Sequence, residues 1–250
     1  MNINEAFKSV CKVLFKRELG ELQEFENYLR TYNEKVSVAK SVSGKDIHYT
    51  APYSKGARFV DYPEAFGKSA DAVKSKPINA DDIKDIDSLA NAAREICYYS
   101  GNKVIGKSEF VEKSENIADS SVVYSSSEIL RCEYVAYSSL LRDSKYMFGS
   151  SCLGESGFCI NVCENNNSQR CFETDIVFFS SDCYYSNNCK SSHEMLFCFD
   201  QRSKSNMVGN NQLEKSQYLK LKEGLIEQMA GELESKKRLP SLLDLLQGGS

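Results

Sequence analysis

The chain has 250 residues, a formal net charge of −4, a hydrophobic fraction of 41% and no tryptophan. This length allows one elongated domain with terminal extensions or two small domains. The negative charge and the lack of a basic patch argue against nucleic acid as the main ligand. No apolar run reaches the roughly 18 residues of a membrane span, and the N-terminal residues carry scattered charges, unlike a secretory signal.

The compartment follows from the lack of such a signal. A protein that stays in the reducing cytoplasm, or joins a particle assembled inside the cell, keeps its cysteines reduced. The ten cysteines are therefore expected to be thiols or metal ligands rather than disulfides.

Residues 1–99 are predicted to form a mixed, partly helical capping region. From Ile3 to Leu29, apolar residues recur at spacings of three and four, which predicts helical structure over residues 1–33. This apolar stripe is expected to pack on the rest of the chain.

Further elements of the N-terminal region follow that stripe. Short β-like runs occur at Val36–Val38 and Ile47–Tyr49, with a turn sequence between them. Asp81 or Asp82 is suited to cap a second helix that runs to about Ile96.

A six-residue repeat fills residues 100–213. In steps of six from Ile105 to Leu213, the residue is apolar or cysteine at every step except Asn165 and Gln201. A second column, three residues later, is mostly serine. The repeat core is predicted to contain Val123, Ile129, Val135, Leu141, Met147, Leu153, Cys159, Cys171, Val177, Cys183 and Cys189.

A period of six suits a short strand followed by a corner, and three such units close a triangular coil. The sequence thus predicts a mainly β protein, a triangular hexapeptide-type β-solenoid of about 18 residues per coil and about six coils, with N- and C-terminal helical caps. In this geometry Val123, Leu141, Cys159 and Val177 stack in one buried row. The caps are expected to cover the unpaired strand edges at the ends of the solenoid.

Residues 214–238 show one apolar stripe and are predicted to form the C-terminal capping helix. Residues 239–250 form a short leucine-rich tail, in which a new helix can start near Pro240. Such a helix is too short to be stable alone, so it needs a surface, either this chain's own cap or a groove on a partner or second copy. The candidate docking residues are Leu239, Leu242, Leu243, Leu245 and Leu246.

One group of side chains looks like a zinc site. Cys183, Cys189, His193 and Cys198 have the residue types that zinc prefers, but they contain no C-x-x-C pair. The cysteines instead follow the six-residue lattice, which favours buried structural thiols. No metal or cofactor is therefore expected.

The residues favour a non-enzymatic protein. Hexapeptide-repeat acyltransferases, the alternative, use a general base, commonly histidine, and this chain has only His48 and His193. Glu128, Asp143 and Asp175 fall at different hexad positions, so no carboxylate pair of a glycosidase is predicted. The preferred function is a rigid scaffold or docking surface, within a larger cellular or viral assembly, that binds a protein partner or further copies of itself.

An outward aromatic strip follows from the same lattice. These residues directly follow an inward position, so they are expected on the outer face, either as a partner site or under the terminal helices. They are Tyr124, Phe148, Phe172, Phe178, Tyr184 and Leu196.

The end of the repeat, from Asn187 to Leu213, carries a resemblance. Together with Tyr218, it resembles uncharacterised Cys- and Asn-rich repeat proteins of environmental bacterial genomes, over about residues 120–230. The matching residues are Cys198, Arg202, Lys204, Asn211 and Gln212, whereas Asn206 and Met207 depart from the pattern. The resemblance implies the β-solenoid architecture and no particular activity.

Overall fold

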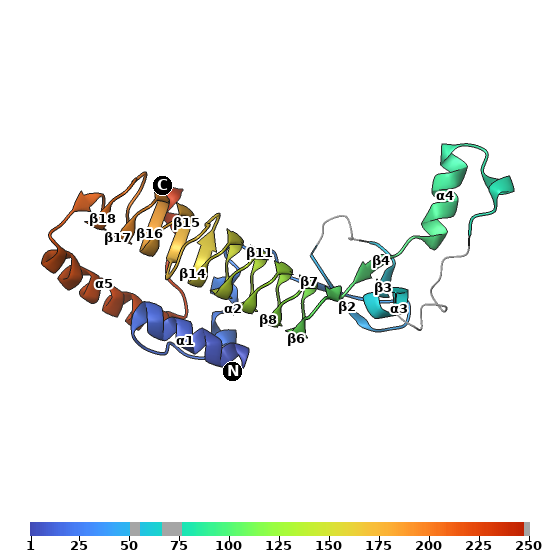
Figure 1. Cartoon of the computed structure of the whole chain (residues 1–250). Coiled ribbons are helices and arrows are strands. Elements are labelled where there is room, and N and C mark those ends of the chain that lie inside the picture. The colour runs from blue at the N-terminus through green and yellow to red at the C-terminus, as the bar shows by residue number, and fades with distance from the viewer. Residues whose placement is uncertain (51–55, 67–76, 248–250) are drawn as a thin grey trace.

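A long β-solenoid forms the centre of the molecule (Figure 1). The structure is a computed structural model that describes residues 1–50, 56–66 and 77–247. The chain has a solenoid of about nine turns of parallel strands, with helices at both ends of the chain, and 38% of it is strand. The predicted mainly β solenoid with terminal helices is confirmed.

Each coil contains 12 residues, so the predicted triangular coil of about 18 residues is wrong. Strand β8 (Ser121–Tyr124) pairs in parallel with β10 (Glu133–Ala136), and Val123 lies opposite Val135. Strand β9 (Ser127–Leu130) pairs in the same way with β11 (Ser139–Arg142). Because consecutive hexads alternate between two sides of the rod, the coil is two-sided, and the rod has about nine turns rather than six.

The two sides are called the first and the second sheet. The first sheet begins with β6 (Glu109–Glu112), β8, β10 and β12 (Lys145–Phe148). The second sheet begins with β5 (Val104–Ile105), β7 (Glu115–Ala118), β9, β11 and β13 (Ser151–Gly154). Longer strands then continue around the corner, and the later strands are β14 (Gly157–Cys163), β15 (Phe172–Phe178), β16 (Ser181–Lys190), β17 (His193–Leu196), β18 (Ser205–Val208) and β19 (Asn211–Gln212).

Two inner rows fill the rod, one from each sheet. Every residue that the sequence assigned to the repeat core is buried, and these residues pack in one cluster. Val123 and Cys159 belong to the first sheet, whereas Leu141 and Val177 belong to the second, so these four residues do not form one row. They stack instead on residues twelve positions away.

A serine ladder lines the remaining interior. Ser126 Oγ donates to the Tyr124 carbonyl at 2.8 Å and accepts from the Ser138 N–H at 3.1 Å. Ser138 Oγ in turn accepts from the Ser150 N–H at 3.1 Å. Since buried polar groups need partners, these contacts explain why the column between the apolar residues is serine, and they place its side chains inward.

The backbone is left-handed at every third residue through the repeat. Examples are Asn116 with φ 58°, Asp119 with φ 46° and Val122 with φ 54°. Such a conformation costs a non-glycine residue about 1–2 kcal/mol. Hydrogen bonds between neighbouring coils must therefore hold these turns, because the residue types do not favour them.

The N-terminal helical stripe is divided into separate helices. Helix α1 (Ile3–Phe15) starts with a capping box at Asn2 and ends at Lys16, whose φ is 61°. A short 3₁₀ segment, η1 (Leu22–Phe25), and α2 (Glu26–Leu29) follow. Their apolar face is buried, as the spacing predicts.

Both long terminal helices lie along the flank of the rod rather than over its ends (Figure 1). Helix α1 packs on β8, β10, β12 and β14, and α5 (Lys215–Lys236) packs on α1 and β18. At the C-terminal end of the rod, the strand edge is covered by the antiparallel pairing of β18 with β19. The helices therefore cover a sheet face, which differs from the expected end caps.

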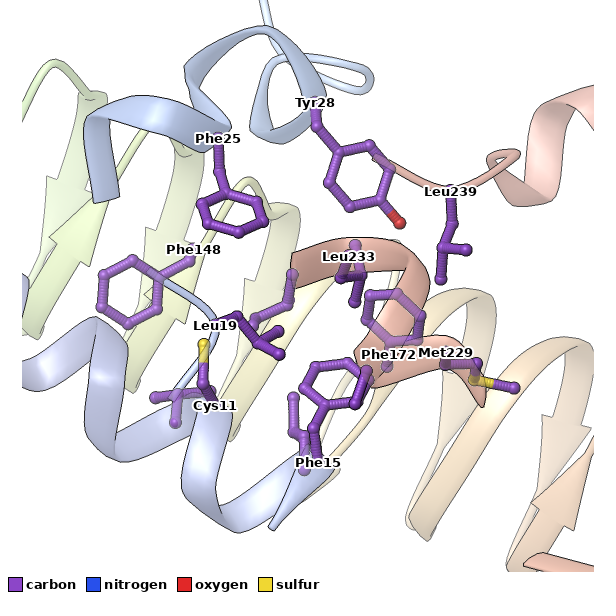
Figure 2. Close-up of a cluster of buried hydrophobic side chains, with 14 of the residues drawn as sticks. Cys11, Phe15, Leu19, Phe25, Tyr28, Phe148, Phe172, Met229, Leu233 and Leu239 are labelled. Carbon is purple, nitrogen blue, oxygen red and sulfur yellow. The ribbon is translucent and has the colours of Figure 1, made fainter. Parts of the chain in front are cut away.

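The aromatic strip of the first sheet lies under these helices (Figure 2). The rings of Phe7 and Phe148 meet edge to face with centroids 5.3 Å apart, and those of Phe15 and Phe172 at 4.9 Å. Tyr184 and Leu196 are buried in the same cluster, and Tyr124 is partly buried against it. Phe178 lies on the second sheet and does not join it.

A small module precedes the rod. Its β1–β2 hairpin agrees with the predicted strands, and its second long helix ends at Ile96 as predicted. The predicted cap of that helix at Asp81 or Asp82 is wrong: these residues lie in a 3₁₀ turn, and Asp85 caps the helix. Strand β3 pairs in parallel with β4. The elements are β1 (Ser37–Lys40), β2 (Asp46–Tyr49), β3 (Phe59–Asp61), α3 (Tyr62–Phe66), η4 (Ala80–Asp82), α4 (Ile86–Ile96) and β4 (Tyr99–Gly101). No helix within the described residues is long and apolar enough to cross a membrane.

Candidate functional site

The leucine-rich tail docks on this chain's own rod. Ser241 caps α6 (Leu242–Leu246), and the helix contacts β15. Leu242 is fully buried and Leu239 is 9% exposed, whereas Leu243, Leu245 and Leu246 are 39%, 44% and 47% exposed. The five candidate docking residues therefore divide into two that anchor the tail and three that face solvent.

Two side chains of the rod hold the tail by its main chain. The Leu242 N–H donates to Glu173 Oε2 at 2.7 Å. The Tyr185 hydroxyl donates to the Pro240 carbonyl at 2.7 Å. Glu173 and Tyr185 occupy the same position of adjacent coils, and we call these two residues the tail clamp.

Glu173 is a buried carboxylate surrounded by neutral donors. The Tyr32 hydroxyl donates to Oε2 at 2.7 Å, and the Asn161 amide donates to Oε1 at 2.8 Å. Burial raises the pKa of Glu173 above its ordinary value, although the hydrogen bonds from Tyr32, Asn161 and Leu242 oppose that rise. The carboxylate thus joins the N-terminal segment, the rod and the tail at one point.

The clamp belongs to a corner column, which lies two residues after each inner position of the first sheet. Arg30 lies over the Tyr137 ring at 4.8 Å. At Gly149, a Cβ would come within 2.6 Å of the Leu29 carbonyl oxygen, so glycine lets the α2 segment approach closely. From the coil of β10 to that of β17, the corner column comprises Tyr137, Gly149, Asn161, Glu173, Tyr185 and Phe197.

The outer face of the second sheet from β7 to β13 is the second surface of interest, and we call it the open face. Among the described residues, the helices that pack on the rod contact the first sheet, β15 and β18. On the open face Leu140 is 50% exposed, and Arg131 pairs with Asp143 across neighbouring coils at 2.6 Å. The open face presents side chains at the regular spacing of adjacent strands, about 4.8 Å.

A small polar pocket of about 220 Å³ lies between the N-terminal module and the first coils. It is lined by two carboxylates, Glu115 and Glu128, together with Lys103. Burial raises the pKa of Glu115, whose oxygens accept hydrogen bonds from the Thr50 N–H and the Tyr99 hydroxyl. Because both Glu115 oxygens are engaged by the chain, we assign this carboxylate to joining the module to the rod.

The cysteines of the suspected zinc group are part of the interior. Cys183, Cys189 and Cys198 are buried, while His193 is exposed and its Nδ1 lies 3.1 Å from Ser181 Oγ. Burial raises the pKa of Cys189 and Cys198, which disfavours the thiolate that zinc binds. In the part of the chain that the structure describes, no group of metal-ligating side chains could hold an ion.

The sequence interpretation missed the clamp residues Glu173 and Tyr185. A single glutamate beside the polar residues Thr174 and Asp175 carries no sign that a tail will cover it. The available signal was the spacing in the sequence. Residues twelve apart, such as Glu173 and Tyr185, lie on one line along the rod once the coil length is known.

Comparison with models of known protein families finds no match for this chain. The curated proteins likewise contain no match to its sequence. The functional argument therefore rests on the geometry of the molecule.

Proposed function

We propose that this protein is a non-enzymatic scaffold that uses its rod as a rigid docking surface for a protein partner or for further copies of itself. The observation that carries this proposal is the contrast between the two outer faces. Helices cover the first sheet, whereas the open face from β7 to β13 remains available.

The interior of the rod supports this proposal. Its inner rows are buried side chains, and serine hydroxyls bridge successive coils. Such a rod is stiff, because its packed core and its hydrogen bonds between coils both resist bending. A rigid rod suits a spacer in a larger assembly, cellular or viral.

The reducing cytoplasm is the compartment that we propose. All ten cysteines are free thiols, and seven of them are buried. This usage fits a compartment in which thiols remain reduced. The acyltransferase alternative rested on a triangular coil, which the 12-residue coil replaces, so no observation favours it here.

The test is site-specific photo-crosslinking in the host cell. A photoreactive residue replaces Leu140 on the open face, and a matched one replaces Leu219, which is 48% exposed on α5. The proposal expects a defined protein or self-adduct from position 140 and a much weaker one from position 219. Equal labelling from both positions, or none from position 140, contradicts the use of the open face.

A further inference from the structure

The docked tail shows what kind of segment the corner column can hold. Leu239 and Leu242 are buried, and Ser241 between them is 5% exposed. Pro240 is exposed, so the position after the first leucine faces solvent. The tail thus lies on the rod as a short peptide lies on a receptor, with two leucine anchors three residues apart.

The clamp recognises the main chain of this segment rather than a particular side chain. Tyr185 donates to the carbonyl of Pro240, and Glu173 accepts the N–H of Leu242. Both groups occur in peptides of other sequences. Specificity must therefore come from the two buried leucines and from the small residue before the second one.

The structure assigns the tail clamp as a peptide-binding site for partner segments of the pattern leucine, any residue, small residue, leucine, with the chain's own tail as an intramolecular competitor. This inference deepens the proposed docking function, on which it rests, by naming the class of partner segment. It concerns the corner column and not the open face, so the crosslinking test at Leu140 can fail or succeed independently.

The contacts that hold the tail are concentrated at Leu239, Pro240 and Leu242. It leaves α5 through Lys237, whose φ is 57°, and α6 has only five residues. Three of its five leucines are exposed. Segments with few buried contacts open locally while the rest of the fold stays intact, so the tail is suited to exchange.

Peptide binding to the full chain tests the inference. The probe is a fluorescein-labelled peptide of residues 237–247, measured by fluorescence anisotropy. Leu242→Asp in the chain should release the tail and free the site, whereas Leu245→Asp, at an exposed position, should leave the tail docked. We expect the Leu242→Asp chain to bind the peptide at least about tenfold more tightly than the wild type or Leu245→Asp, because a tethered competitor acts at high local concentration.

Two further variants examine the clamp itself. In the Leu242→Asp chain, Glu173→Leu removes the acceptor for the Leu242 N–H, and Tyr185→Phe removes the donor to the Pro240 carbonyl. Each variant should weaken peptide binding by about 3- to 10-fold, as expected for the loss of one hydrogen bond. A peptide that carries Leu242→Asp should not bind. If the folded Leu242→Asp chain binds no peptide, or binds it no more tightly than the wild type does, the inference is overturned.

Hydrogen exchange of the wild-type chain decides the case in which Leu242→Asp does not fold. The Leu242 amide should exchange at least about 100-fold faster than the Val177 amide, because the tail opens locally and the rod does not. Equal exchange rates would mean that the tail leaves only when the rod unfolds, which overturns the inference. If the wild-type chain is a dimer and Leu242→Asp makes it a monomer, the site binds the tail of a second copy. That result would also overturn the assignment of the site to a partner peptide.

Discussion

The two sheets of the rod have similar interiors and different exteriors. Both inner rows are largely apolar and buried, with Asn165 and Gln201 as the exceptions in the second sheet, and the same serine columns separate them. Directly after the inner position, however, the first sheet carries Phe148 and Phe172, whereas the second sheet carries Arg142 and Phe178. The first pair lies under α1 and α5, and the second pair faces outward.

This difference separates two roles within one hexad. The inner position and the serine position build the coil on both sides, while the outer position decides what each face binds. The terminal helices cover the first sheet because its outer residues are large and apolar. Among the described residues, the terminal helices do not pack on the second sheet from β7 to β13, where the outer residues are mixed.

The largest expected effect comes from charge in either inner row. Val123→Asp in the first sheet and Ile129→Asp in the second each bury an unpaired carboxylate, since both side chains are 1% exposed. Each substitution should cost more than about 4 kcal/mol, so neither variant should show a cooperative thermal transition. A stably folded variant on only one sheet would contradict the equivalence of the two inner rows.

The outer positions should respond unequally. Phe172→Ala and Phe178→Ala change the same residue type, six positions apart, on opposite sheets. Phe172 is fully buried against Phe15, so its loss should cost about 3–5 kcal/mol in urea denaturation. Phe178 is half-buried, and its loss should cost roughly 1 kcal/mol. Equal losses would remove the distinction between the helix-covered outer positions of the first sheet and the outer positions of the second sheet.

The serine ladder should contribute less than the apolar contacts. Ser138→Ala leaves the buried N–H of Ser150 without its acceptor, which should cost about 1–3 kcal/mol. The control is Ser191→Ala, at an exposed position, which should change the free energy of unfolding by less than about 0.5 kcal/mol. A neutral Ser138→Ala would show that the ladder fills space without stabilising the coil.

The smallest expected effect is the pH dependence of the tail junction. Burial raises the pKa of Glu173 above its ordinary value of 4.5, so the folded state holds this proton more tightly than the unfolded chain does. The free energy of unfolding should therefore fall as the pH rises from 4.5 through the raised pKa and should then level off.

The Glu173→Gln variant isolates this contribution. Glu115 and Asp175 also have raised pKa values, and they remain in both proteins. Denaturation measured from about pH 4 to about pH 8 should show a smaller decline for Glu173→Gln than for the wild type. Identical pH profiles would mean that burial does not control the protonation of Glu173.

Much of the architecture was predictable from the sequence. The hexad places an apolar residue inward whichever number of hexads closes a coil, so the solenoid and its buried residues follow from it. The apolar stripe of α1 also has a clear sequence signal. The cap of α4 does not, because several aspartates precede this helix and the structure uses Asp85 rather than Asp81 or Asp82.

The coil length was not predictable from the hexad alone, because two or three hexads can close a turn. Residues twelve apart give the better signal: Cys159, Cys171 and Cys183 form one uninterrupted run along the first sheet. The left-handed turns were also not predictable, because residues such as Val122 and Ile176 do not favour that conformation.

The candidate site was only partly predictable. The leucines of the tail suggested docking, but the sequence does not show which of them face the rod. That depends on Glu173 and Tyr185, which become neighbours of the tail only when coils of the correct length bring them to one corner.

The two-sided coil of 12 residues is the central claim, and a disulfide test measures it most directly. In a chain with Cys97→Ser and Cys163→Ser, Leu140→Cys introduces a thiol opposite the exposed Cys152, since Ser139 pairs with Ser151 and Leu141 with Leu153. The Cα atoms of neighbouring strands lie about 4.8 Å apart, within the range of a disulfide.

The control variant in the same background is Tyr134→Cys, eighteen residues before Cys152, where a triangular coil would place a neighbour. After mild oxidation, mass spectrometry of the unreduced chain should show the loss of two hydrogens for Leu140→Cys and no loss for Tyr134→Cys. A disulfide between positions 134 and 152, without one between positions 140 and 152, would contradict the two-sided coil.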